Sequence, residues 1–147
     1  MKSKYTLGLV LLVAALLSQS LSNIERKPVF LIHGVSAEMT KAEVSASSTP
    51  FTNVAVTVPM APGQIEKPYV LLGTDGRINL VVGDQLEFGE DVIRSGESAS
   101  KLLNSLGHPA KITPVNGAFE NWHYDSRLVV RVAPVRKTII EFVLAGV

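Results

Sequence analysis

Hydrophobic residues form one unbroken run near the N-terminus and only short, spaced groups after it. The run extends from Leu7 to Leu17, behind two lysines and ahead of a serine-rich stretch that ends at Ser22. A basic head, an apolar middle of about ten residues and a small-residue exit are typical of an export signal. The pattern therefore predicts a signal peptide over residues 1–22 and a mature segment over residues 23–147.

The same run leaves a second interpretation open. A membrane-spanning helix needs about 20 apolar residues, and the run approaches that length only when it is extended to residues 5–21, which include serines and a glutamine. Residues 5–21 could then stay attached as an inner-membrane anchor, with the two lysines holding the N-terminus inside. In both interpretations the rest of the chain is periplasmic or secreted.

Apolar positions downstream follow the alternation of β-strands. Val29 to Ile32 form a short strand closed by a glycine, and Val54, Val56 and Val58 alternate with small or polar residues. The clearest hairpin covers Tyr69 to Val82, where Asp75-Gly76 separates two apolar runs. This dipeptide predicts a two-residue turn whose central positions both have positive φ.

One helix stands out after the hairpin. Ser95 is a suitable cap and Glu97 suits the positive end of the helix dipole in the first turn, while Gly107 and Pro109 end the pattern. Between these signals lies one apolar face, formed by Ala99, Leu102, Leu103 and Leu106. Residues 35–50 are rich in Ser, Ala and Thr, which is consistent with a loose helix over 37–44 or with a linker.

Further strands are expected at Ala110–Ile112, Trp122–Tyr124, Leu128–Val132 and Thr138–Leu144. Parity places Leu128, Val130 and Val132 on one face and Arg127 and Arg131 on the other, and it groups Ile140, Phe142 and Leu144. The sheet is therefore expected to be apolar on one side and wetted on the other. The fold class that follows is a single α+β domain, an antiparallel sheet of meander and hairpins packed by one or two helices.

Composition narrows the function classes. The chain has no cysteine, which excludes disulfides, thiolate nucleophiles and thiolate metal sites. A net charge of +1 does not favour nucleic acid as a partner, and the basic residues Arg127, Arg131, Arg136 and Lys137 fit a solvated strand edge better than a nucleic-acid face. An exported segment without disulfides depends on its core alone, which favours a bacterial envelope.

From Ser95 onward the chain combines a small-residue helix cap, a helix ending in Leu106-Gly107-x-Pro109, a short strand and Trp122-x-Tyr124 before another apolar strand. This order resembles the helix-plus-meander unit of outer-membrane assembly lipoproteins of the SmpA/OmlA type and of β-lactamase-inhibitor-like folds. The resemblance covers the last third of the chain, and the cysteine that carries the lipid in those lipoproteins is missing here. It implies a non-catalytic domain that works by presenting a surface.

Two catalytic or metal-binding patterns compete with that interpretation. His33-Gly34 after an apolar strand and Gly96-x-Ser98 resemble parts of an esterase, with His108 or His123 as base and Asp125 as its orienting group. The nucleophile elbow of esterases has the pattern G-x-S-x-G, and here its last glycine is replaced by Ser100. In addition, no core strand leads into Gly96. The three histidines have no spacing typical of a metal site, so no metal and no other cofactor is expected.

The expected function is therefore that of a non-catalytic, protein-binding accessory or assembly factor of the envelope. An inner-membrane-anchored co-regulator that stabilises a sensor partner remains an alternative, and a small esterase or thioesterase is a third. The partner is another protein, and the membrane is contacted only through residues 5–21 if they stay attached. Aromatic and guanidinium side chains of the last meander are the expected binding surface: Phe119, Trp122, Tyr124, Arg127 and Arg131. For Trp122 and Tyr124, a role in core packing against Leu102 and Leu106 is the other interpretation.

Overall fold

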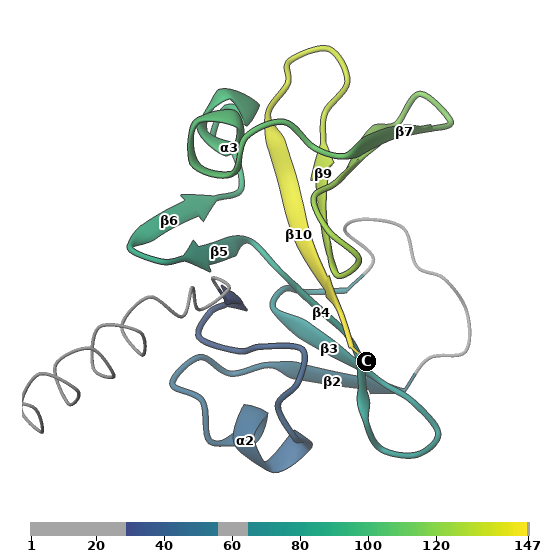
Figure 1. Cartoon of the computed structure of the whole chain (residues 1–147). Helices are drawn as coiled ribbons and strands as arrows, with labels where there is room; N and C mark the ends of the chain where they lie inside the picture. Colours follow the sequence, from purple (N-terminus) through teal and green to yellow (C-terminus); the bar gives the residue numbers. More distant parts are fainter. Residues whose placement is uncertain (1–28, 56–64, 147) are drawn as a thin grey trace, which may run out of the picture.

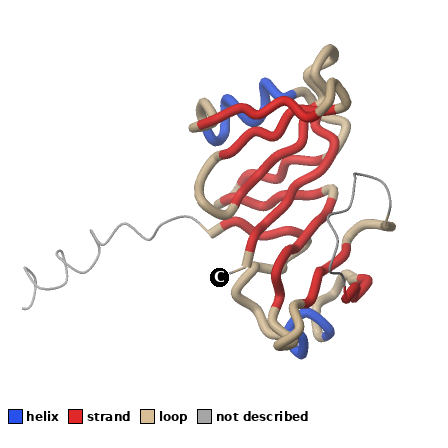
Figure 2. The backbone as a smooth tube through the Cα atoms, turned by 90° about the vertical axis from the view of Figure 1, so that its right-hand side faces the viewer, coloured by secondary structure: helices blue, strands red, loops and turns tan. Residues whose placement is uncertain are grey.

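Strands make up most of the structure, which is a computed structural model that describes residues 29–55 and 65–146 (Figure 1). The predicted export segment and Val56 and Val58 lie outside the described residues. Ten strands form a seven-stranded and a three-stranded sheet, and two short helices accompany them. Figure 2 shows the two helices at opposite ends of the strands. The expectation of an α+β chain dominated by sheet is confirmed at this level.

The seven-stranded sheet has the order β2-β3-β4-β10-β9-β8-β7. Its pairs are antiparallel except β2 and β3, which run parallel and correct the expectation of a purely antiparallel sheet. Parallel neighbours need a long connection, and residues 56–68 separate these two strands. The strands are β2 (Thr52–Ala55), β3 (Tyr69–Leu72), β4 (Ile78–Gly83), β7 (Lys111–Val115), β8 (Phe119–His123), β9 (Leu128–Val132) and β10 (Ile139–Ala145).

The three-stranded sheet is antiparallel and has the order β1-β5-β6, with β1 (Phe30–Ile32), β5 (Gln85–Phe88) and β6 (Asp91–Arg94). The chain passes into it directly from β4 through Gly83 and Asp84. A Cβ atom at Gly83 would lie 2.4 Å from Cγ2 of Ile32. Because only glycine permits this close approach, Gly83 lets β1 pack where one sheet gives way to the other.

Helix α3 (Ala99–Leu106) forms where it was predicted, but its cap is Ser98 and not Ser95. The Ser98 side chain accepts a hydrogen bond from the Ser100 amide at 3.3 Å. The residues before it lie along β10: Ser95 Oγ donates to the Ile140 carbonyl at 2.5 Å, and the Gly96 amide donates to the Ile139 carbonyl at 2.8 Å. These bonds hold residues 95–97 in a turn against β10, so the helix begins later.

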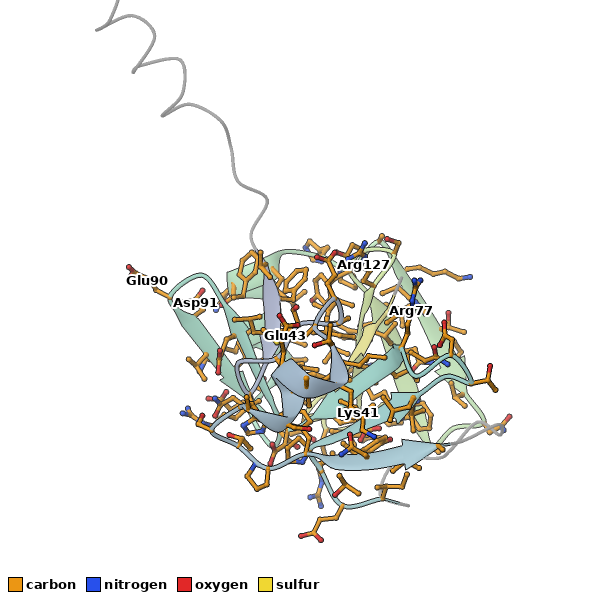
Figure 3. The ribbon with its side chains drawn as sticks, turned by 90° about the horizontal axis from the view of Figure 1, so that it is seen from below. Lys41, Glu43, Arg77, Glu90, Asp91 and Arg127 are labelled. Atoms are coloured by element: carbon orange, nitrogen blue, oxygen red, sulfur yellow. The ribbon has the colours of Figure 1, made fainter. Side chains whose placement is uncertain are left out.

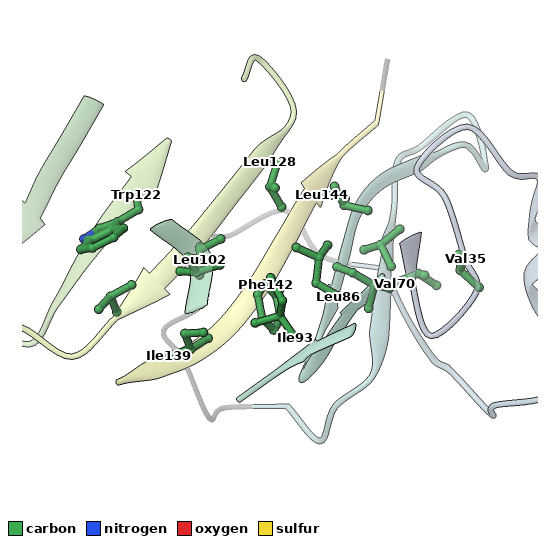
Figure 4. Close-up of a cluster of buried hydrophobic side chains, with 14 of the residues drawn as sticks. Val35, Val70, Leu86, Ile93, Leu102, Trp122, Leu128, Ile139, Phe142 and Leu144 are labelled. Carbon is green, nitrogen blue, oxygen red and sulfur yellow. The ribbon is translucent and has the colours of Figure 1, made fainter. Parts of the chain in front are cut away.

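The main core lies on one face of the large sheet, under α3 and the small sheet. In Figure 4 it extends from Trp122 through Leu102 and Phe142 to Val35. Ala99 and Leu102 are buried there, and Leu103 and Leu106 pack against the same cluster. The apolar face of the helix and the inward face of β9, Leu128, Val130 and Val132, are thereby confirmed.

Strand β10 departs from the expected alternation. A bulge between Ile139 and Glu141 shifts its register against β9. Ile139 therefore enters the core in place of Ile140, while Phe142 and Leu144 do so as predicted. A bulge places two residues opposite one, which inverts the parity on its far side.

The turns also differ from expectation. Asp75 has no positive φ, because Gly73–Arg77 forms a longer loop in which only Gly76 is left-handed, at φ 76°. The two-residue turn with two positive φ values lies instead at Asn116 (48°) and Gly117 (70°), where the Ala118 amide donates to the Val115 carbonyl at 2.9 Å. Asn-Gly is the preferred dipeptide for such a turn, so the sequence carried a signal that the strand pattern obscured.

Two further expectations are settled by the structure. Residues 41–45 form the short helix α2 (Lys41–Ser45), and a capping box between Thr40 and Glu43 starts it. The outer face of the large sheet is not simply wetted, because Tyr69, Val82 and Val143 form a second buried cluster there. Among the polar residues that β8, β9 and β10 place on that face, Asn121 and Arg131 are partly exposed, whereas Glu141 is buried.

Candidate protein-binding surface

The five residues predicted to form the binding surface do not form one patch. Strands β8 and β9 are antiparallel, with Asn121 opposite Arg131. Phe119 and Arg131 therefore lie at one end of the outer face, whereas Arg127 lies at the other end in the β8–β9 turn. Trp122 and Tyr124 have the opposite parity to Phe119 and contact the main core.

Phe119 and Arg131 contact each other. The guanidinium carbon of Arg131 lies 5.3 Å from the centroid of the Phe119 ring, within cation–π range. The same guanidinium donates through Nη1 to Oε1 of Glu141, a carboxylate that is 1 % exposed. Lys67 Nζ lies 3.3 Å from the other carboxylate oxygen. Arg131 is thus held between an aromatic ring and a buried anion, in a fixed orientation.

Trp122 occupies the core position. Its side chain is 6 % exposed, and its indole Nε1 donates to Oε2 of Glu120 at 3.0 Å. Tyr124 is half-buried against the same core, its hydroxyl has no hydrogen-bond partner within the described residues, and burial raises its pKa to about 12. These placements agree with the packing interpretation of both aromatic residues.

Arg127 forms an ion pair with Glu38, which belongs to the segment before α2. The pair stands at the edge of a hollow that opens beside the β8–β9 turn. Arg127 is therefore accessible, but it belongs to a different surface from Phe119 and Arg131.

The most exposed large apolar side chain at the Phe119 and Arg131 end of the sheet belongs to a residue that the sequence patterns did not select. Val135 is 91 % exposed in the β9–β10 loop. Hydrogen bonds close the loop, from the Ala133 amide to the Thr138 carbonyl (2.8 Å) and from the Lys137 amide to the Ala133 carbonyl (3.0 Å). The sequence did offer one signal for this exposure: the valine lies between Pro134 and Arg136 and belongs to neither of the two flanking predicted strands.

The loop is also attached to the neighbouring strand. Lys137 Nζ donates to both carboxylate oxygens of Glu120, at 2.7 and 2.9 Å. Hydrogen bonds from Lys137 and then from Trp122 lower the pKa of Glu120 below its ordinary value. In Figure 1 the β9–β10 loop and the β7–β8 hairpin lie at the same end of the sheet. We call this end the apical surface, formed by Phe119, Glu120, Arg131, Val135, Arg136 and Lys137.

The residues of the esterase-like pattern are not brought together. Ser98 Oγ is engaged by Ser100, in the cap of α3. His33 Nε2 lies 2.6 Å from Oδ1 of Asp84, and His123 Nε2 lies 3.4 Å from Thr113 Oγ1. Asp125 Oδ1 accepts the amides of Arg127 and Leu128, both at 2.7 Å. Within the described residues, Ser98 forms no hydrogen bond with a histidine.

Metal-binding side chains are likewise dispersed: residues 29–55 and 65–146 contain no group of three or more His, Asp or Glu side chains arranged to hold a metal ion. In the same ranges no helix is long and apolar enough to cross a membrane. The carboxylates Glu87, Glu90 and Asp91 belong to the β5–β6 hairpin.

No protein-family model, curated protein or solved structure matches this chain. The resemblance to the envelope lipoproteins and to β-lactamase-inhibitor-like folds therefore stays a prediction.

Proposed function

We propose that this protein is an exported, non-catalytic domain of the bacterial envelope that binds another protein through its apical surface. The observation that carries the proposal is Val135, 91 % exposed on a loop that three hydrogen-bonded contacts hold in shape. Arg136 is exposed next to it, and Arg131 stacks on Phe119 at the same end of the sheet.

The physical reason is the combination of apolar and guanidinium groups on a pre-ordered frame. Aromatic and arginine side chains dominate the energetics of protein interfaces. Association costs about 0.5–1.5 kcal/mol for each mobile side chain that must be ordered. A loop that is already closed by its own hydrogen bonds, and an arginine already fixed by Glu141, avoid part of this cost.

The export part of the proposal rests on the N-terminal pattern of two lysines, an apolar run and serines. An inner-membrane anchor is the alternative, with the same binding domain as a co-regulator of a membrane partner. The mass of the mature N-terminus distinguishes the two forms. Loss of about the first 22 residues supports the cleaved signal, and an intact Met1 in the membrane fraction supports the anchor.

The binding surface is tested by site-specific photo-crosslinking in the native envelope. A crosslinking residue at Val135 is expected to give a discrete adduct, and one at the exposed Glu90 of the β5–β6 turn serves as the control. A Val135→Asp, Arg136→Glu double variant should lose co-purification of the crosslinked partner while its melting temperature stays within a degree or two of wild type. Equal adducts at Val135 and Glu90, or an unchanged partner in the double variant, would contradict the proposal.

A further inference from the structure

A hollow of about 470 Å³ lies at the end of the molecule opposite the apical surface. It is formed by segments that are distant in sequence: the start of β1, the residues before α2, the β8–β9 turn and the end of β10. Figure 3 views the molecule from this side and labels Arg127, one of the lining residues. We call it the basal hollow.

The lining of the basal hollow is partly apolar and firmly placed. Phe30 stacks on Phe88 with ring centroids 5.0 Å apart, and Leu144 is a buried member of the main core. Val29, which is 62 % exposed, and Ala37 complete the apolar lining. An apolar side chain of a ligand would therefore find a preformed contact surface there.

Some of the charged residues around the basal hollow form an ion pair and one does not. Arg127 is paired with Glu38, so these two charges offset each other. The remaining charged residue is Asp125, whose Oδ1 accepts two backbone amides. These bonds fix the carboxylate in place, and it has no ion pair in the part of the chain that the structure describes. The free charge presented to a ligand is negative.

A second hollow of about 330 Å³ adjoins the first and shares Ala37 and Glu38 with it. Its lining includes Lys41 and Arg77, which Figure 3 shows on this same side of the molecule. Arg77 is paired with Asp75 in the same hollow (3.8 Å), whereas Lys41 has no ion pair among the described residues. A cationic group is therefore repelled by Lys41 and attracted by Asp125. The charge distribution therefore orients such a ligand within the basal hollow.

We propose that the basal hollow is a second binding site, which accepts an extended segment of a partner protein with an apolar residue and, two positions later, a lysine or arginine. The apolar side chain contacts Phe30, Ala37 and Leu144, and the cationic group pairs with Asp125. Side chains two positions apart in an extended chain point to the same side of it, so one face of the segment presents both groups to the hollow. This site is separate from the apical surface and goes beyond the proposed function.

The test uses the full-length chain in mild detergent and two probes, N-acetyl-valyl-glycyl-lysine amide and N-acetyl-valyl-glycyl-glutamate amide, with binding followed by NMR titration. The lysine probe is expected to bind more tightly than the glutamate probe. Asp125→Asn keeps the turn acceptor and removes the charge, and it should weaken the lysine probe about two- to fivefold, the range for an exposed ion pair. Asp91→Asn is the control, because Asp91 is an exposed aspartate of the β5–β6 hairpin and lines neither hollow.

A second variant keeps the proposal testable if Asp125→Asn disturbs the turn. Glu38→Gln releases Arg127, and it should shift the preference toward the glutamate probe. Equal binding of both probes, no binding of either at millimolar concentration, or no effect of both variants would overturn the proposal. The apical double variant should leave the lysine probe unaffected, so this site and the proposed function fail or stand separately.

Discussion

Lys137 and Glu120 connect the exposed β9–β10 loop to the interior of the protein. The Lys137 ammonium lies 2.7 and 2.9 Å from the two carboxylate oxygens, and one of these oxygens also accepts the indole N–H of the buried Trp122 at 3.0 Å. One carboxylate therefore satisfies a core donor and holds a surface loop. The shape of the proposed apical surface depends on a group that also belongs to the packing of β8.

This arrangement predicts a pH-dependent contribution to stability. The folded-state pKa of Glu120 lies below its ordinary value of 4.5, so its carboxylate stabilises the folded chain above about pH 4.5, and this contribution is lost as pH falls through the lowered pKa. Glu120→Gln should therefore be less stable than wild type at pH 7, with a difference that shrinks toward pH 3. Urea unfolding at both pH values measures it. Glu90→Gln, at an exposed turn, is the control. Its difference in unfolding free energy from wild type should not change between the two pH values.

The packing of α3 predicts unequal effects of two leucine truncations. Leu102 is 0 % exposed, whereas Leu106 is only partly buried against the same core. Leu102→Ala should lower the free energy of unfolding by about 2–5 kcal/mol, and Leu106→Ala by clearly less. Denaturant unfolding of both variants tests this order. Equal small losses would mean that α3 does not pack inward as described.

The buried carboxylate of Glu141 predicts a large effect from a small change. Glu141→Gln removes the charge that faces both Arg131 and Lys67, leaving two cations near a buried site. Since removal of one partner from a buried ion pair is strongly destabilising, a loss of about 3–5 kcal/mol is expected. Glu66→Gln, an exposed neighbour of Lys67 in sequence, should change stability little. Indistinguishable unfolding midpoints of the two variants would contradict the described cluster.

The loop between β3 and β4 predicts a position-specific backbone effect. Gly76 has φ 76°, a conformation that costs a side-chain-bearing residue about 1–2 kcal/mol. Gly76→Val should destabilise by at least this amount, because a β-branched residue resists positive φ. Thr74→Val, exposed in the same loop and without positive φ, is the matched substitution. Equal melting temperatures for the two variants would show that the loop differs from this geometry.

Local patterns predicted much of the secondary structure. The spacing of Ala99, Leu102, Leu103 and Leu106 specified the helix and its buried face, and the alternation in Leu128–Val132 specified the inward side of β9. These predictions succeeded because periodicity depends on which residues leave water, and that information is local. The binding residues were less predictable, since exposure of an aromatic side chain depends on which face the rest of the chain covers.

The sequence alone determined the predominance of strand, the positions of α3, β1 and β9, the absence of disulfides and the export-like pattern of the N-terminus. Only the tertiary structure decided that Trp122 is in the core, that a bulge brings Ile139 into the core in place of Ile140, and that Val135 stands exposed on a closed loop. The physical reason is that burial and hydrogen bonding of these residues arise from strands that are neighbours in the sheet but distant in the chain. The residue pattern along one strand does not specify which strands are its neighbours in the sheet.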